Sequence, residues 1–310
     1  MLQHEASVWI GFSALVLALL VVDLRVLNRR SHVLSVREAG LWSAGLAVLA
    51  LCFGIFLGIA ESSRYALEFY TGYLIELSLS VDNLFVFLLI FQYFNVPAEL
   101  QPRVLKWGIM GAIVLRGIMI AIGAVLLAQF RWIIYVFGSL LIITGIRFYK
   151  SSVEERLEPE RNPLVRLARR IFPFTPGYQR DRFFVRAGRG WLATPLFLVI
   201  LVVEWSDLVF AIDSIPAIFA ITQEPFIVYS SNVFAILGLR ALYFVLATAI
   251  DRFVYLKPAV ATILVFVGVK MVGSAWFHIP TAASLAVVVG LLTGGVLASM
   301  VATRRAPVSN

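Results

Sequence analysis

Five carboxylates lie inside two apolar stretches of the sequence, where charged side chains are rare. Glu76 and Asp82 fall in "ELSLSVDNL", and Glu204, Asp207 and Asp213 fall in "VVEWSDLVFAIDSIPAIFAI". An ionised side chain at the centre of a bilayer costs about 3 kcal/mol, so chains keep it mainly where it is paired or functional. These acids are therefore the first candidates for chemistry.

Neutral oxygen donors accompany the acids. Asn83 follows Asp82, Ser214 follows Asp213, and Asn232 lies in a later apolar stretch. An all-oxygen set favours hard cations such as magnesium, calcium or manganese. The single cysteine, and histidines that fall only at the ends of apolar stretches, make a zinc or copper site unexpected. A proton pathway or a purely structural role would suit acids in a membrane equally well, so the residues alone leave these alternatives open.

Three basic residues, Arg116, Arg240 and Lys270, lie inside other apolar stretches. We expect Arg116 and Arg240 to pair with the acids while the site is empty, and Lys270 to contribute to charge pairing. Five acids and three bases leave two negative charges, which suits a divalent cation or two protons. The structural alternative is that the acids only hold helices together through ion pairs.

The composition is that of a polytopic membrane protein, since 61% of the 310 residues are hydrophobic and only 14% are charged. We predict an all-α transmembrane helical bundle that forms a single domain over residues 1–310. Its nine spans are expected at 7–24, 41–60, 67–94, 104–127, 132–149, 192–220, 227–249, 258–278 and 281–303.

The distribution of the 26 Lys and Arg residues predicts the orientation. Most of them fall in segments that share one side of the membrane if the N-terminus is outside, which predicts an N-out, C-in chain. The basic segment 150–190 is then a cytoplasmic loop, most simply a solvated linker with short amphipathic pieces, and otherwise a docking surface for a cytoplasmic partner. Topology and contact with anionic lipid account for the net charge of +8, so no nucleic-acid partner is expected.

The apolar stretches also resemble one another in order. Arg116 in "GAIVLRGI" matches Arg240 in "AILGLRAL", and Gly145 in "LLIITGIRFY" matches Gly268 in "ILVFVGVKMV". The acidic segment "ELSLSVDNL" can likewise be aligned with "DLVFAIDSI". Chance similarity between apolar helices is the alternative to a true repeat.

The matches predict two three-helix repeats, spans 3–5 over 67–149 and spans 6–8 over 192–278, with the C-terminal span 281–303 outside them. Because each unit has three spans, the second copy enters the membrane from the opposite side. Such inverted repeats are the plan of many secondary transporters, whose ion sites lie near the midplane.

Helical geometry restricts which of these side chains can meet. Residues seven apart, such as Glu76 with Asn83 and Asp207 with Ser214, share a helix face, whereas residues six apart point away from each other. If both acids of one repeat serve one site, the helix must bend, and Pro216 could cause this in the second repeat.

Four segments resemble the TerC/Alx family of integral membrane proteins: "EFYTGYLIELSLSVDNLFVF", "FFVRAGRGWLATPLFLVILVVEWSDLVFAIDSIPAIFAIT", "FIVYSSNVFAILGLRALYF" and "FVGVKMV". The resemblance runs from about residue 8 to 303. It implies a role in manganese efflux and homeostasis, in supplying metal to exported enzymes or, by older naming, in tellurite resistance or redox modulation. Carried over by position, the acidic motifs of the family fall on Glu68, Glu76, Asp82, Asn83, Glu204, Asp207, Asp213 and Ser214.

The expected function is manganese(II) export from cytoplasm to periplasm across the bacterial inner membrane, by alternating access. No enzymatic activity or bound cofactor is expected, because the sequence has no P-loop, nucleotide fingerprint or Ser-His-Asp arrangement. Two rivals remain, a membrane scaffold that hands metal to partners and a redox or stress-response modulator.

Each candidate residue has an expected role in this function. Asp82 and Asp213 are the central ligands, and Glu204 and Glu68 are accessory acids. The residues that complete or flank the site are Glu76, Asp207, Asn83, Ser214 and Asn232.

Overall fold

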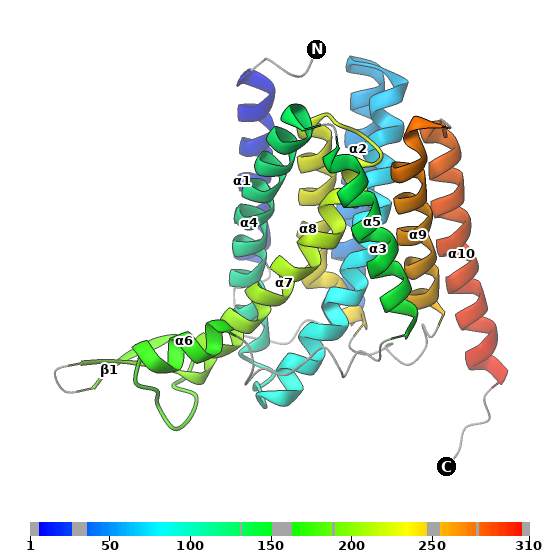
Figure 1. The fold of residues 1–310 in the computed structure, drawn as a ribbon. Coiled ribbons are helices and arrows are strands. Elements are labelled where there is room, and N and C mark those ends of the chain that lie inside the picture. Colours follow the sequence, from blue (N-terminus) through cyan, green and yellow to red (C-terminus); the bar gives the residue numbers. More distant parts are fainter. Residues whose placement is uncertain are drawn as a thin grey trace.

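The computed structural model describes residues 6–26, 36–130, 132–150, 163–187, 190–246, 255–276 and 279–305 of the chain. They form a bundle of long helices with a small lobe at one end (Figure 1). The long helices are α1 (Ala6–Val26), α2 (Val36–Ala60), α3 (Ser63–Tyr93), α4 (Gln101–Gln129), α5 (Ile133–Lys150), α7 (Pro195–Phe219), α8 (Pro225–Leu246), α9 (Leu256–Val272) and α10 (Thr281–Arg305).

The described helices confirm a helical, multi-pass membrane protein. Six of them, α2, α4, α7, α8, α9 and α10, contain a stretch long and apolar enough to cross a membrane. Shorter apolar stretches, Ser7–Val22 and Ile133–Arg147, belong to α1 and α5. A crossing by α1, α3 and α5, which would make nine spans, stays a prediction.

The ends of the described helices differ by a few residues from the predicted span boundaries. The span predicted at 192–220 begins later, at Pro195, because residues 190–193 form a β-strand. The span predicted at 258–278 corresponds to a candidate span from Lys257 to Ala275, in which α9 ends at Val272 and the 3-10 turn η4 (Gly273–Ala275) follows directly.

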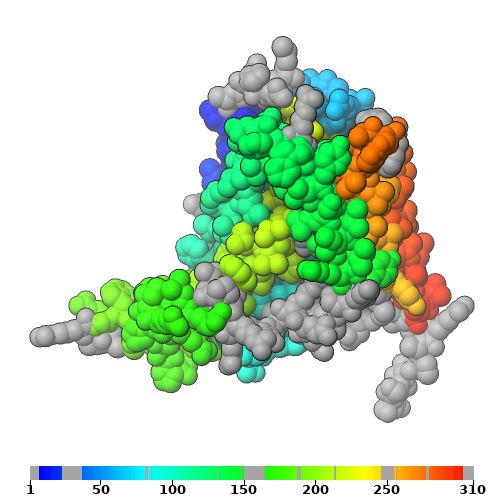
Figure 2. All heavy atoms as spheres, viewed as in Figure 1, coloured from blue at the N-terminus to red at the C-terminus, as the bar shows by residue number. Residues whose placement is uncertain are grey.

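The segment predicted as a cytoplasmic loop contains regular structure in its described part. α6 (Pro163–Ile171) and the antiparallel strands β1 (Phe184–Ala187) and β2 (Gly190–Ala193) form a lobe that extends sideways from the bundle (Figures 1 and 2). We call residues 163–193, as far as they are described, the lobe. The bundle agrees with the all-α prediction, and this short hairpin is an unpredicted addition in which aromatic and β-branched residues favour strands over helix.

α8 is the central helix of the bundle. Of its most apolar window 89% is buried inside the protein, against 17% for α10 at the periphery. The helices α2, α3 and α4 pack around it. The polar residues of α8 are therefore enclosed by protein rather than by lipid.

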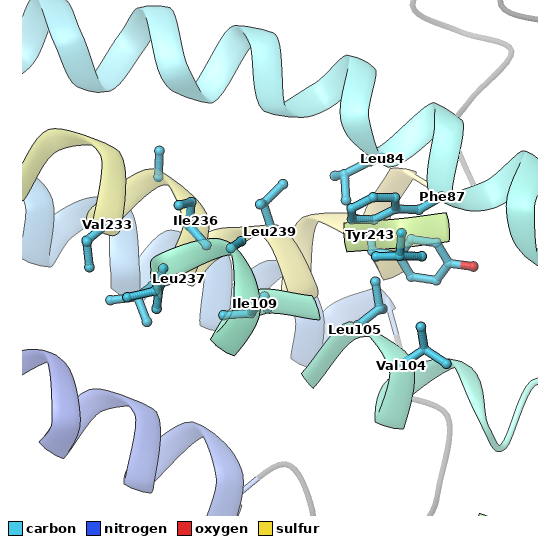
Figure 3. Close-up of a cluster of buried hydrophobic side chains, with 14 of the residues drawn as sticks. Leu84, Phe87, Val104, Leu105, Ile109, Val233, Ile236, Leu237, Leu239 and Tyr243 are labelled. Atoms are coloured by element: carbon cyan, nitrogen blue, oxygen red, sulfur yellow. The ribbon is translucent and has the colours of Figure 1, made fainter. Parts of the chain in front are cut away.

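Buried apolar side chains form two clusters in the bundle. One cluster joins the C-terminal part of α3, the N-terminal part of α4 and α8 (Figure 3). Its labelled members are Leu84, Phe87, Val104, Leu105, Ile109, Val233, Ile236, Leu237, Leu239 and Tyr243. The second cluster includes Ile120, Ile218 and Val267.

α5 and α9 pack closely through glycines. A Cβ atom on Gly145 would lie 2.9 Å from the carbonyl oxygen of Ala261, and one on Gly268 would lie 2.7 Å from the carbonyl oxygen of Gly138. Ala261 lies seven residues before Gly268, and Gly138 lies seven residues before Gly145. Each glycine therefore contacts the equivalent position of the other helix, so the two contacts interchange when α5 and α9 are exchanged. The contact of α3 with α8 likewise corresponds to the contact of α7 with α4 when the two sets of helices are exchanged.

Candidate metal centre

The guanidinium group of Arg116 is the centre of a buried polar cluster between α3, α4, α7 and α8. Arg116 is 1% exposed, and its Nη2 and Nε donate to the two carboxylate oxygens of Asp207 at 2.9 and 3.3 Å. Its Nη1 donates to Oε1 of Glu76, which is also completely buried. Arg116 thus forms salt bridges with acids from α3 and α7 at once.

Two neutral residues complete the hydrogen bonds of this guanidinium. Nη1 of Arg116 donates to Oδ1 of Asn232 on α8 at 2.7 Å and to Oγ of Ser214 on α7 at 3.4 Å. Asp207 and Ser214 therefore contact the same group, which confirms that residues seven apart on this helix share a face. Each partner of the guanidinium among the described residues is an oxygen atom.

Glycines let α3 approach α8 and let α4 approach α7. A Cβ atom on Gly72 of α3 would lie 2.9 Å from Oγ of Ser231 on α8, and one on Gly108 of α4 would lie 3.1 Å from Val203 of α7. Glycine inside an apolar helix is a known signal of close helix packing in membranes. Sequence reasoning missed Gly72 and Gly108 as contact points of the helices that carry the site, although this signal could have found them.

Several buried polar atoms of α3 and α8 have no hydrogen-bond partner among the described residues. They include Oε2 of Glu76, Nδ2 of Asn232, Oδ1 of Asn83 and Oγ of Ser80. A buried polar atom without a partner costs about 1–3 kcal/mol. Glu76 and Asn232 therefore each use only part of their hydrogen-bonding capacity in holding Arg116.

Some predicted site residues lie elsewhere or outside the description. The side chains of Asp82 and Asp213, the predicted central ligands, are outside the described residues. Glu204 is half-buried on α7 and lies against Gly111 of α4, where a Cβ atom would lie 2.1 Å from its Oε1. Arg240 is buried on α8.

Glu68 and Lys270 lie away from the Arg116 cluster. Glu68 accepts a hydrogen bond from Nε of Arg64 at 2.7 Å and is completely buried. Nζ of Lys270 donates to Oγ of Ser284 on α10 at 2.9 Å. Both residues line a cavity of about 750 Å³ that the start of α3 and the end of α9 share.

The described acids do not form a preassembled metal cage. Among the described side chains, no group of three or more His, Cys, Asp or Glu residues is arranged to hold a metal ion. Glu76 and Asp207 instead meet through Arg116. With both acids ionised, these three side chains carry one net negative charge.

Comparison with known proteins agrees with this architecture. The sequence profile of the integral membrane protein TerC family matches residues 61–307. The chain belongs to the TerC family. The match includes every residue of the Arg116 cluster.

Individual relatives cover almost the whole chain. A membrane protein of Myxococcus xanthus, STKORF319, is 49% identical over 98% of this chain and 95% of its own length. Alx of Escherichia coli (strain K12), whose name proposes a role as a membrane-bound redox modulator, is 48% identical over 92% of this chain and 91% of its own. A membrane protein of Rickettsia felis is 42% identical over 94% of this chain and 97% of its own. No solved structure matches the chain.

Proposed function

We propose that this TerC family member exports manganese(II) across the bacterial inner membrane, using the oxygens that now hold Arg116. The observation that carries the proposal is the convergence of Glu76, Asp207, Asn232 and Ser214 on one cationic group. Carboxylate, amide and hydroxyl oxygens are the ligands that hard divalent cations prefer. The same atoms can therefore accept either the guanidinium or a metal ion.

Arg116 acts as an internal substitute for the transported ion. In its absence the buried carboxylates of Glu76 and Asp207 would face each other without a counter-charge, at a cost of several kcal/mol. A divalent cation neutralises both acids, so the guanidinium is released when the ion binds. The partnerless oxygen of Glu76 then becomes a further ligand.

The two halves of the bundle provide the motion that export requires. We propose that α3–α5 and α7–α9 are inverted repeats that rock about the site, as in other transporters with this plan. The interchanging contacts of Gly145 and Gly268 support an axis that relates α5 to α9.

Manganese is the ion we favour among the hard cations. The ligand types fit magnesium, calcium and manganese alike, and the resemblance to the TerC/Alx family selects manganese. Export rather than import follows from the same resemblance. The redox role proposed by the name of the Escherichia coli relative has less support here, because the chain has one cysteine and so cannot form an intrachain disulfide.

Growth in raised manganese tests the proposal in cells that lack manganese exporters of their own. The wild-type chain should restore growth and lower cellular manganese, whereas Glu76→Gln should do neither at equal membrane abundance. Glu99→Gln is the matched control, because Glu99 is an exposed acid outside the bundle interior. Normal resistance with Glu76→Gln, or none with the wild type, would overturn the proposal.

A further inference from the structure

The lobe is firmly attached to the end of the bundle. The hydroxyl of Tyr178 donates to the backbone oxygen of Phe94, just after α3, at 2.7 Å. Arg103, in the first turn of α4, forms a salt bridge with Asp181. Burial raises the pKa of Tyr178 to about 12. These bonds hold the lobe at the level where α3 ends and α4 begins, which is the expected position of the lipid headgroups.

The lobe carries a strong positive charge. Its described part contains one acid, Asp181, which already pairs with Arg103. Its exposed basic residues are Arg166, Arg169, Arg170, Arg180, Arg182 and Arg186. Basic side chains beside a membrane attract anionic lipid.

Apolar side chains are exposed on the same lobe. Leu167 and Ile171 of α6 are 53% and 60% exposed, and Trp191 of β2 is 63% exposed. α6 buries Val165 and Ala168 against the protein. On its exposed side, the arginines lie next to the apolar residues Leu167 and Ile171. This mixture is typical of helices that lie in the interface of a membrane, and tryptophan is enriched at that depth.

A cleft lies between this helix and the bundle. It measures about 450 Å³, and Arg169 is the charged residue of its lining. The apolar residues that line it include Phe94, Phe172, Phe174, Pro195 and Leu198. An apolar cleft with a cationic rim fits an acyl chain joined to a phosphate, whereas a free phosphate ion would leave the aromatic lining without a partner.

We propose that this cleft binds an anionic phospholipid of the cytoplasmic leaflet. Part of an acyl chain fills the cleft beside Phe172 and Leu198, and the phosphate group lies at Arg169. The neighbouring arginines of α6 add long-range attraction. This lipid site is separate from the Arg116 cluster and does not depend on what the protein transports.

Thermal unfolding of the purified full-length protein in neutral detergent tests the proposal. Phosphatidylglycerol should raise the Tm more than phosphatidylcholine does, and Arg169→Gln should remove most of that difference. Arg169→Lys should keep much of it, because the charge remains. The matched control is Arg147→Gln, since Arg147 is an exposed base of α5 outside the lobe and should leave the difference unchanged.

Native mass spectrometry supplies a second measurement on the same variants. The wild type and Arg147→Gln should keep bound phosphatidylglycerol at a collision energy in the mass spectrometer that removes the lipid from Arg169→Gln. An equal Tm difference and equal lipid retention in the wild type and Arg169→Gln would overturn the proposal. Stabilisation by inorganic phosphate alone that depends on Arg169 would also overturn it, in favour of an anion site.

Discussion

Arg116 and Asp207 face each other through two hydrogen bonds in the closed interior of the bundle, with donor-to-acceptor distances of 2.9 and 3.3 Å. This paired geometry is the arrangement in which a guanidinium binds a carboxylate most strongly. Asp207 is 3% exposed, so water does not weaken the pair. Any ion that uses Asp207 must therefore compete with Arg116.

Replacement of Arg116 should expose this competition. We expect Arg116→Gln to lower the free energy of unfolding by about 3–5 kcal/mol in the absence of metal, because it leaves two buried carboxylates without a counter-ion. Manganese should then raise the Tm of the variant more than that of the wild type. In the double variant Arg116→Gln with Glu76→Gln, manganese should no longer raise the Tm more than it does in the wild type. If the double variant keeps the larger manganese-dependent rise in Tm, Arg116 and manganese do not compete for the same oxygens.

Asn232 and Ser214 should contribute differently to the free energy of unfolding. The bond from Arg116 to Asn232 is 2.7 Å long, whereas the bond to Ser214 is 3.4 Å long. We expect Asn232→Ala to cost about 1–3 kcal/mol of unfolding free energy, as is usual when a charged donor loses a buried partner. Ser214→Ala should cost clearly less in the same denaturation experiment. The reverse order would contradict the geometry described for Arg116.

The glycine contact between α5 and α9 should be sensitive to one added methyl group. Gly268→Ala would place a Cβ atom 2.7 Å from the backbone oxygen of Gly138, which cannot rotate away. We expect a loss of about 1–3 kcal/mol in unfolding free energy, together with reduced transport. Gly290→Ala on α10 is the matched control, because nothing lies within 4 Å of its Cβ position. Equal stability of the two variants would contradict close packing at Gly268.

Much of the fold and of the site could be predicted because charge is so costly in hydrocarbon. The apolar runs marked the long helices, and the rare polar residues within them included Glu76, Arg116, Asp207 and Asn232, which the structure brings together. The spacing of Asp207 and Ser214 predicted a shared face. These features follow from residue type and helical period alone.

The partners across helices could not be predicted in the same way. Helices that are apolar on every side leave their rotation about the axis open, so the sequence could not show that Arg116 would join Glu76 to Asp207. The contact of Lys270 with Ser284 depends on how α10 packs against α9, which the sequence does not show. The complete burial of Glu68 likewise depends on the packing of neighbouring segments. The hairpin in the lobe was missed because its strands are short and lie in a basic, mixed segment.

Manganese flux into a reporter dye, measured in proteoliposomes of purified protein, tests the central claim most directly. The wild type should carry manganese, and Glu76→Gln and Asp207→Asn should each slow the flux at least about tenfold, which corresponds to about 1.4 kcal/mol. Asp82→Asn and Asp213→Asn test the predicted central ligands in the same vesicles, and Glu99→Gln should match the wild type. No manganese flux with the wild type, or equal flux with Glu76→Gln and Asp207→Asn, would contradict the account.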